Sequence, residues 1–344
     1  MRVVVADPPA FTPVYDHELA AALARAGVEV ELVTSRFRFG AVPEPAGYAR
    51  RELFYPVSSR VFARSRLRLP AKVLEHPIGL ARLARLPADV VHVQWLTPEL
   101  DDRFLRHRAP LVLTAHDLLP RRTAAKTELW RRIFARFERV VVHSESGREV
   151  LSEFGVAEEK LRVIPHPVSP SDPARADDGR TVLALGMIRP YKQVGHAAAA
   201  ARLAGARLLV AGDPVGPLPN LDGAELRLGY LSNAELERAL GDATVAVFPY
   251  RAELDQSGAL LQALGAGIPA VVYDVGGLAE PVRSYGAGRV VPADDVAALG
   301  AALGELLDDP DALEAARAGA MRARGELTWD RSAEAHLALY RELL

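Results

Sequence analysis

The stretch from residue 245 to residue 280 constrains the fold more than any other part of the chain. It reads VAVFPYRAELDQSGALLQALGAGIPAVVYDVGGLAE, and two short apolar runs in it, residues 245–248 and 270–273, are separated by a polar loop and a helix-like segment, residues 258–265. Apolar runs that are bounded by loops and joined through short helices are typical of buried strands in a parallel sheet. The segment therefore predicts an α/β architecture.

The loop before the helix-like segment has the features of a phosphate site. Gln256, Ser257 and Gly258 stand where that helix begins, and the first amide groups of a helix have no acceptor inside it. Such amide groups, together with the helix dipole, form a site that favours phosphate. A glycine there lets a ligand approach the backbone closely. Gly276 and Gly277 follow the next strand, and both loops fall on the edge of a parallel sheet where ligands bind. We therefore expect one ligand at this edge; the alternative is that the glycines serve only turns and packing.

The same segment resembles the donor-binding signature of retaining GT-B glycosyltransferases of family GT4. The matching residues are Phe248-Pro249, Gly267-x-Pro269 and Asp274-x-Gly276-Gly277-x-x-Glu280. The family usually carries two glutamates eight residues apart around this helix, whereas this chain has Leu254 at the first position and Gln262 at the second. Its QSG loop is similar to a variant branch of the family. This departure affects the expected ribose and sugar contacts and leaves the expected phosphate site in place.

The resemblance extends over nearly the whole chain and implies a GT-B fold, in which two Rossmann-like domains of parallel strands face each other across a cleft. We expect an acceptor-side domain over residues 1–167, a nucleotide-sugar donor domain over residues 168–328, and a final helix, residues 329–344, that packs back on the first domain. The first loop, PPAFTPVYD, replaces a glycine pair that is usual in the family. Asp16 and His17 are acceptor-side candidates there, and the alternative is a role at the start of the helix.

The resemblance also implies which residues act on the donor. Arg189 and Lys192 lie three residues apart in a loop between a strand and a helix, where the family carries an Arg and a Lys that neutralise the leaving diphosphate. A planar guanidinium and a point-charge ammonium suit that role. His116 ends a strand, at the place of a family histidine that contacts the donor sugar. Glu253, with Asp255 as the alternative, is expected to reach the sugar hydroxyl groups.

Further donor contacts follow from position. In the family the nucleotide base lies against the turn before a helix that here opens with the capping box of Ser232 and Glu235, so Tyr230 and Leu231 are base-side candidates. Gln262 stands where other members have a ribose-binding Glu. The other residues of the predicted donor-binding set are Gly186, Gln256, Ser257, Gly258, Gly276, Gly277 and Glu280.

The function that the resemblance implies is the transfer of a hexosyl group from a nucleoside diphosphate sugar, with retention and without a metal or other cofactor. The one D-x-D run, at Asp309, is explained by helix initiation, because Pro310 suits a first helical position. The acceptor is unknown, with lipid-linked and polysaccharide acceptors both open. Two alternatives remain: a catalytically silent GT-B subunit that binds a nucleotide or a partner, which the missing glutamates favour, and a sugar-nucleotide epimerase of the same fold.

Positive charge is concentrated in the first half of the chain. Residues 1–165 contain 26 Lys and Arg against 20 Asp and Glu, and the remainder contains 16 against 24. The two basic clusters are Arg50, Arg51, Arg60, Arg64, Arg66, Arg68 and Lys72, and Arg121, Arg122, Lys126, Arg131, Arg132, Arg136 and Arg139. Basic amphipathic stretches bind anionic membranes; the alternative is a solvated basic face over an ordinary core. The nearly neutral chain has no recognised nucleic-acid motif, which disfavours a nucleic-acid partner.

Three absences in the sequence narrow the cellular setting. The N-terminus, MRVVVAD, enters a strand at once, so we expect no signal peptide. No apolar run approaches the roughly 18 residues that span a bilayer. The chain has no cysteine, which excludes disulfides and thiolate metal sites. We expect a cytoplasmic protein, with peripheral contact at the inner membrane face as a hypothesis.

Overall fold

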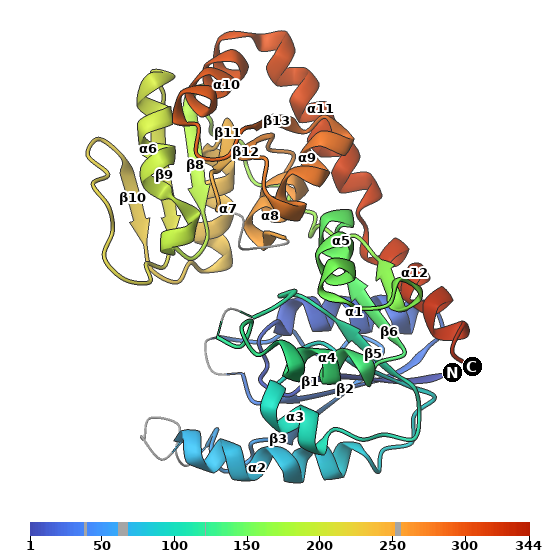
Figure 1. The fold of residues 1–344 in the computed structure, drawn as a ribbon. Coiled ribbons are helices and arrows are strands. Elements are labelled where there is room, and N and C mark those ends of the chain that lie inside the picture. The colour runs from blue at the N-terminus through green and yellow to red at the C-terminus, as the bar shows by residue number, and fades with distance from the viewer. Residues whose placement is uncertain (38–39, 61–67, 121, 252–255) are drawn as a thin grey trace. The chain divides into compact units, whose positions relative to one another are not determined.

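The computed structural model describes residues 1–37, 40–60, 68–120, 122–251 and 256–344. The chain forms two units (Figure 1): unit 1 comprises Met1–Pro165 and Trp329–Leu344, and unit 2 comprises His166–Thr328. The chain therefore passes between the units twice. Close to these crossings the amide of Val168 donates a hydrogen bond to the carbonyl oxygen of Leu327 at 2.8 Å, so the two connecting segments are joined to each other.

Unit 1 is built on a seven-stranded parallel sheet in the order β3-β2-β1-β4-β5-β6-β7. Its strands are β1 (Arg2–Asp7), β2 (Glu29–Ser35), β3 (Ala49–Phe54), β4 (Val90–Val93), β5 (Leu111–Thr114), β6 (Arg139–Val142) and β7 (Leu161–Val163). The strand order reverses between β1 and β4, which makes this the topological switch point of the sheet. The central strands are apolar on both faces because helices cover both sides.

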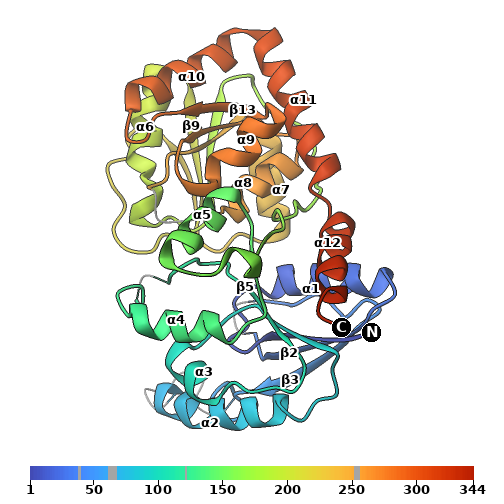
Figure 2. The same cartoon turned by 45° about the vertical axis from the view of Figure 1, so that its right-hand side comes forward.

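The helices of unit 1 lie on both faces of this sheet. They are α1 (Pro13–Arg25), α2 (Arg68–Leu83), α3 (Pro98–Phe104), α4 (Thr127–Ala135), α5 (Glu145–Phe154), η1 (Glu158–Lys160) and α12 (Trp329–Arg341). One core contains Leu19 of α1 and Tyr340 of α12, and the other contains Leu80 of α2, Ile133 of α4 and Leu151 of α5. In Figures 1 and 2, α12 (red) lies beside α1 (blue). The final helix thus packs on the first unit, as the family resemblance implies.

Unit 2 has a six-stranded parallel sheet in the order β10-β9-β8-β11-β12-β13, with its switch point between β8 and β11. The strands are β8 (Thr181–Leu185), β9 (Arg207–Gly212), β10 (Glu225–Leu228), β11 (Val245–Phe248), β12 (Ala270–Tyr273) and β13 (Gly288–Val291). The helices are η2 (Pro190–Lys192), α6 (Val194–Leu203), α7 (Asn233–Asp242), α8 (Gly258–Gly265), η3 (Gly276–Leu278), α9 (Ala279–Tyr285), α10 (Val296–Asp308) and α11 (Pro310–Glu326). The two predicted strands and the helix between them are confirmed as β11, β12 and α8. The predicted α/β class with two parallel sheets is confirmed as well.

The first basic cluster of the sequence overlaps two elements that charge alone did not predict, β3 and the start of α2. β3 is an edge strand, and most of its side chains are exposed or half-buried, so no apolar run marks it. α2 follows directly on residues 61–67, which lie outside the described ranges. None of the helices in those ranges combines the length and apolarity that crossing a bilayer requires.

Candidate active site

Three loops meet at the carboxyl edge of the unit 2 sheet, and hydrogen bonds join them. The amide of Arg251, after β11, donates to the carbonyl oxygen of Tyr191, after β8, at 2.9 Å. The rings of Tyr191 and Tyr250 meet edge to face with their centroids 5.8 Å apart. Gln256 donates from Nε2 to the carbonyl oxygen of Gly277 at 3.1 Å, which joins the third loop, after β12. The loops that the sequence assigned to one sheet edge are therefore in contact.

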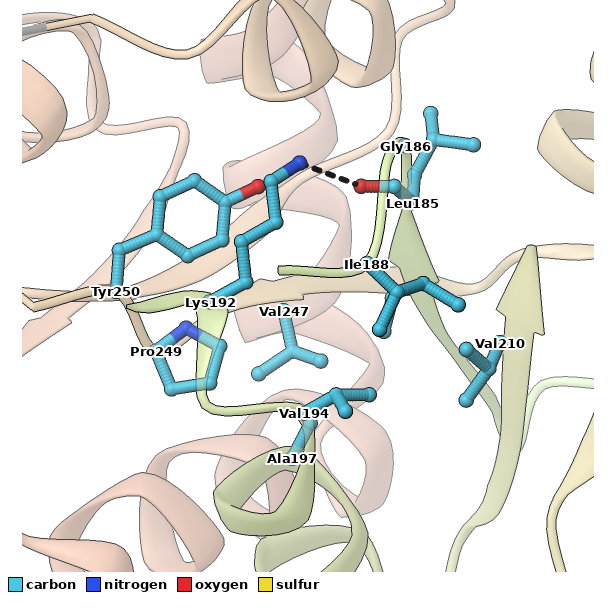
Figure 3. Close-up of a pocket in the computed structure, with 11 residues that line it drawn as sticks. Leu185, Gly186, Ile188, Lys192, Val194, Ala197, Val210, Val247, Pro249 and Tyr250 are labelled. Atoms are coloured by element: carbon cyan, nitrogen blue, oxygen red, sulfur yellow. Dashed lines mark hydrogen bonds between the residues drawn. The ribbon is translucent and has the colours of Figure 1, made fainter. Parts of the chain in front are cut away.

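Lys192 extends its side chain across the switch point (Figure 3). Its Nζ donates to the carbonyl oxygen of Leu185 at 3.4 Å and lies 5.0 Å from the centroid of the Tyr250 ring. A Cβ added to Gly186, whose φ is +94°, would come within 3.0 Å of that Nζ and 3.2 Å of the Cβ of Ala259. The Lys192 ammonium group and the first turn of α8 therefore both border Gly186, and a side chain at position 186 would intrude on both.

Among the residues that the structure describes, the charge around Lys192 is positive. Burial, with a contribution from the nearby Arg189 cation, lowers the pKa of Lys192 to about 8. Within the described part of the chain, neither Arg189 nor Lys192 forms an ion pair with a carboxylate. This is notable because residues 166–328 contain 14 Lys and Arg against 21 Asp and Glu. A perturbed cation beside a second cation, with no counter-ion among the described residues, is the electrostatic pattern of an anion site.

The N-terminus of α8 adds hydrogen-bond donors to this positive charge. Ser257 caps the helix by accepting the amide of Leu260 at 3.3 Å, and its hydroxyl lies 3.4 Å from that of Tyr250. The amide groups of Gly258 and Ala259 meet no acceptor among the residues that the structure describes. A Cβ added to Gly258 would have nothing within 4 Å. The protein itself therefore does not require glycine at this position, whereas a ligand resting on the helix end would.

A small apolar cavity lies below the Lys192 side chain (Figure 3). Its volume of about 20 Å³ is enough for roughly one water molecule. The residues that line it include Ile188, Val194, Ala197, Val210, Val247 and Pro249. This cavity is too small for a nucleotide, and its position shows instead that the Lys192 stem rests on apolar side chains while the ammonium group faces the loops.

The remaining residues that the sequence predicted to bind the donor belong to unit 2, apart from His116, and they differ in how exposed they are to solvent. Gln262 is exposed on α8, Gly276 is exposed, and Glu280 is half-buried in the first turn of α9. Tyr230 is 72% exposed and Leu231 is half-buried, and both precede α7. Glu253, predicted to contact the sugar, and its alternative Asp255 lie outside the described residues.

The capping box that the sequence predicted before α7 is present. The Ser232 hydroxyl accepts the amide of Glu235, and the Glu235 carboxylate accepts the amide of Ser232 at 2.8 Å.

The sequence interpretation did not include Tyr250, which contacts both Lys192 and Ser257. Its available signal was an aromatic residue directly after the Phe248-Pro249 pair.

His116 belongs to unit 1, where it takes part in a cluster of rings beyond β4, β5 and β6. It donates from Nε2 to Oε1 of Gln94 at 2.9 Å, and its Nδ1 lies 3.4 Å from Nε2 of His143. Trp95 stacks on its ring at a centroid distance of 5.2 Å, and Tyr15 meets it edge to face at 4.7 Å. The ring is thus held in place at the carboxyl edge of its sheet, and its contact with a donor sugar stays a prediction.

Of the two acceptor-side candidates, Asp16 is buried and His17 is half-buried. Its side chain is 1% exposed and hydrogen-bonds the carboxyl group of Asp7 at the end of β1. Burial and the Asp7 charge raise the pKa of Asp16 well above its ordinary value. His17 is half-buried, with Nδ1 2.9 Å from the Tyr48 hydroxyl. The burial of Asp16 favours the alternative interpretation, a role at the start of α1.

The D-x-D run is a helix cap in the structure. Asp309 accepts the amides of Asp311 and Ala312 at 3.0 and 3.1 Å, and Pro310 occupies the first position of α11, which confirms the predicted helix initiation. Among the described residues, no three His, Cys, Asp or Glu side chains gather as the ligands of a metal would.

Comparison with known families agrees with this architecture. Residues 14–172 match the model of Glycosyltransferase Family 4, and residues 179–309 match that of Glycosyl transferases group 1. Two parallel Rossmann-like sheets, each with loops at its switch point, are the fold of the GT-B glycosyltransferases. The chain belongs to family 4 of these enzymes.

The individual relatives share 28% or less of their sequence with this chain. The D-inositol 3-phosphate glycosyltransferase of Mycobacterium tuberculosis (strain H37Rv) is 28% identical over 96% of this chain and 78% of its own length. Sucrose-phosphate synthase from Thermosynechococcus elongatus superposes with a TM-score of 0.73 at 21% identity, covering 100% of this chain and 99% of its own. Anabaena HepE in complex with UDP and glucose gives a TM-score of 0.67 at 14% identity, with full coverage of both chains (100% and 100%). The catalytic domain of starch synthase IV from Arabidopsis thaliana, bound to ADP and acarbose, gives 0.70 at 13% identity and covers 99% and 98%.

Proposed function

We propose that this glycosyltransferase moves a hexosyl group from a nucleoside diphosphate sugar to an acceptor, with retention of anomeric configuration and without a metal ion. The observation that carries the proposal is the position of Lys192. Its ammonium group lies beside Arg189, has no carboxylate partner in the described part of the chain, and approaches the open N-terminus of α8. Two cations and free amide groups at a switch point form a site for a diphosphate.

In this proposal the site acts on the leaving group. When the bond between the anomeric carbon and the diphosphate oxygen breaks, negative charge grows on the departing phosphates. Arg189, Lys192 and the amides of Gly258 and Ala259 are in place before that charge develops, so they stabilise the transition state more than the ground state. Their cationic charge takes the place of a metal ion at the diphosphate.

Contacts with the rest of the donor are assigned from the family pattern. His116 and Glu253 are proposed to bind the transferred sugar, and Gln262 the ribose. A neutral amide makes a weaker hydrogen bond than a carboxylate does, because the bond is not charge-assisted. Tyr230 and Leu231 are proposed to lie beside the base.

The base, the sugar and the acceptor are still to be identified. Among the fold neighbours, HepE was solved with UDP and starch synthase IV with ADP, so both nucleotides are candidates here, together with GDP. A thermal-shift screen with UDP, GDP and ADP identifies the base first. Product NMR then tests retention, because the anomeric coupling constant distinguishes the two configurations. A lipid-linked or polysaccharide acceptor, and peripheral contact with an anionic membrane, are further parts of the proposal.

The decisive test is substitution of the two cations. We expect Arg189→Ala and Lys192→Ala each to lower kcat/KM by roughly 10²–10³-fold, the usual cost of removing one group that stabilises transition-state charge. Arg202→Ala is the matched control, because Arg202 is an exposed cation at the end of α6 in the same unit. If both site variants keep donor affinity and turnover, the mechanism is wrong.

Three further outcomes separate the alternatives. Activity that EDTA abolishes would overturn the metal-independent mechanism. Binding of radiolabelled nucleotide sugars with neither transfer nor hydrolysis would identify a silent subunit. Conversion of the donor sugar into its epimer without any acceptor would identify an epimerase.

A further inference from the structure

The outward side of α2 is apolar. Leu69, Val73, Leu74 and Ile78 are 72%, 54%, 73% and 53% exposed, and we refer to these four residues as the α2 stripe. Leu69 and Val73 are four residues apart, as are Leu74 and Ile78, and residues at this spacing lie on the same side of a helix. Ala81, one turn further on, is exposed as well. Single exposed apolar residues are ordinary, whereas a contiguous group marks an interaction surface.

Buried contacts fix the rotation of α2 and keep the stripe outward. Leu80 and Leu83 are buried in the core beneath the helix. His76 is fully buried, donates from Nε2 to Oδ1 of Asp101 at 2.8 Å, and has its Nδ1 2.6 Å from the Tyr55 hydroxyl. Turning the stripe inward would break these hydrogen bonds inside the protein, and among the described residues of unit 1 none covers the stripe.

The charge around the stripe is positive. Glu75 is the one acidic residue of α2, and its two carboxylate oxygens accept the amides of Val57 and Ser58 at 2.7 and 3.0 Å. Arg82 and Arg85 are exposed about one and two turns beyond Ile78, and neither has an ion-pair partner among the described residues. The outward side of this region therefore offers apolar side chains and uncompensated arginines.

This charge decides between the possible occupants. A symmetric contact with a second copy of the chain would bring the arginines of two α2 helices together, which is unfavourable. An anionic lipid surface matches both the aliphatic stripe and the arginines. The second basic cluster of the sequence lacks this property, because on α4 Arg131 pairs with Glu128 and Arg132 pairs with Asp102 at 2.9 Å.

We propose that α2 is a membrane-docking surface, on which the α2 stripe enters the headgroup region of an anionic bilayer while Arg82 and Arg85 contact lipid phosphates. The proposal rests on the membrane contact named under the proposed function and assigns it to one helix of unit 1; its test does not depend on glycosyl transfer. Arg82 and Arg85 lie beyond the first basic cluster along the chain and belong to neither of the two clusters named from the sequence.

Vesicle flotation of the full chain tests this surface. We expect the wild-type protein to float with vesicles of phosphatidylcholine and phosphatidylglycerol, but not with phosphatidylcholine alone. Leu74→Glu and Ile78→Glu should each lower the bound fraction about tenfold, because each removes aliphatic area from the interface and adds a repelled charge. Arg82→Gln combined with Arg85→Gln should weaken binding and reduce its salt dependence. Leu203→Glu is the matched control, since Leu203 is 66% exposed at the end of a unit 2 helix.

Several results would overturn the proposal. The first is failure of the wild-type protein to float with anionic vesicles. The second is equal flotation of Leu74→Glu and the Leu203→Glu control, whether both variants bind the vesicles or both lose binding. If Leu74→Glu converts a dimer into a monomer in sedimentation while the wild type ignores vesicles, a second copy covers the stripe instead. Circular dichroism and an equal thermal shift with nucleoside diphosphate confirm that the variants are folded and that the donor site is intact.

Discussion

At the scale of single residues, Lys192 makes the proposed donor site sensitive to pH. Its pKa is lowered to about 8 in the free protein, and a bound diphosphate favours its charged form. Above that pH, binding requires the uptake of a proton, so affinity should fall roughly tenfold between about pH 7 and about pH 9. Calorimetric titration with a nucleoside diphosphate measures the effect. Lys192→Arg should abolish the pH dependence, because a guanidinium stays charged; an unchanged dependence in that variant would assign it to another group.

The residue scale also shows where prediction from sequence ended. Arg189 and Lys192 could be singled out because they lie close together in one loop and match a family pattern. The contacts of Tyr250 with Lys192 and Ser257 could not be predicted, since they depend on β8 and β11 lying side by side although about 60 residues separate them. Likewise, the sequence placed Asp16 at a helix start but could not show that it is buried against Asp7.

At the scale of elements, two glycines of α8 should respond oppositely to alanine. Gly258→Ala meets no protein atom within 4 Å, so the free energy of unfolding should be unchanged or rise by up to about 1 kcal/mol, while donor affinity should fall at least tenfold. In Gly265→Ala the new Cβ would lie 2.3 Å from the carbonyl oxygen of Ser169, so stability should fall by roughly 1–3 kcal/mol. Denaturant unfolding and calorimetry separate the two effects. Unimpaired donor binding by Gly258→Ala would remove α8 from the site.

Elements differed in how far the sequence specified them. β11, α8 and β12 were predicted to the residue because apolar runs there end at glycine, proline or a polar loop. β3 was missed, since an edge strand with mostly exposed side chains carries no such run. α2 presents the opposite difficulty: its aliphatic residues do not all face the core, so apolar spacing alone cannot show that a stripe of them is outward.

At the scale of the whole molecule, α12 belongs to the core of unit 1. The Tyr340 hydroxyl is 2.6 Å from Nδ1 of His92, and both side chains are fully buried. Tyr340→Phe would leave that nitrogen without a partner and should cost about 1–3 kcal/mol of stability. Hydrogen exchange should locate the loss in unit 1 and leave unit 2 protected. Tyr230→Phe, at a 72% exposed position, serves as the control; faster exchange in unit 2 of the Tyr340 variant would contradict this division.

The two-sheet architecture was predictable from alternating apolar runs and from the family resemblance, because both describe local order along the chain. The return of α12 to unit 1 came from the resemblance alone. No periodicity within residues 329–344 specifies which of the two units the helix will cover, since that choice depends on contacts with α1 more than 300 residues away.

The second passage of the chain between the units has a consequence for biosynthesis. A ribosome releases residues 1–165 first, yet the surface of α1 that Trp329 and Tyr340 cover stays bare until residues 329–341 have been made. Residues 166–328, which form unit 2, are finished earlier. Protein domains generally fold as they emerge, so here the nascent chain should mature from its centre, and a polypeptide that stops before residue 329 leaves the first-made half incomplete.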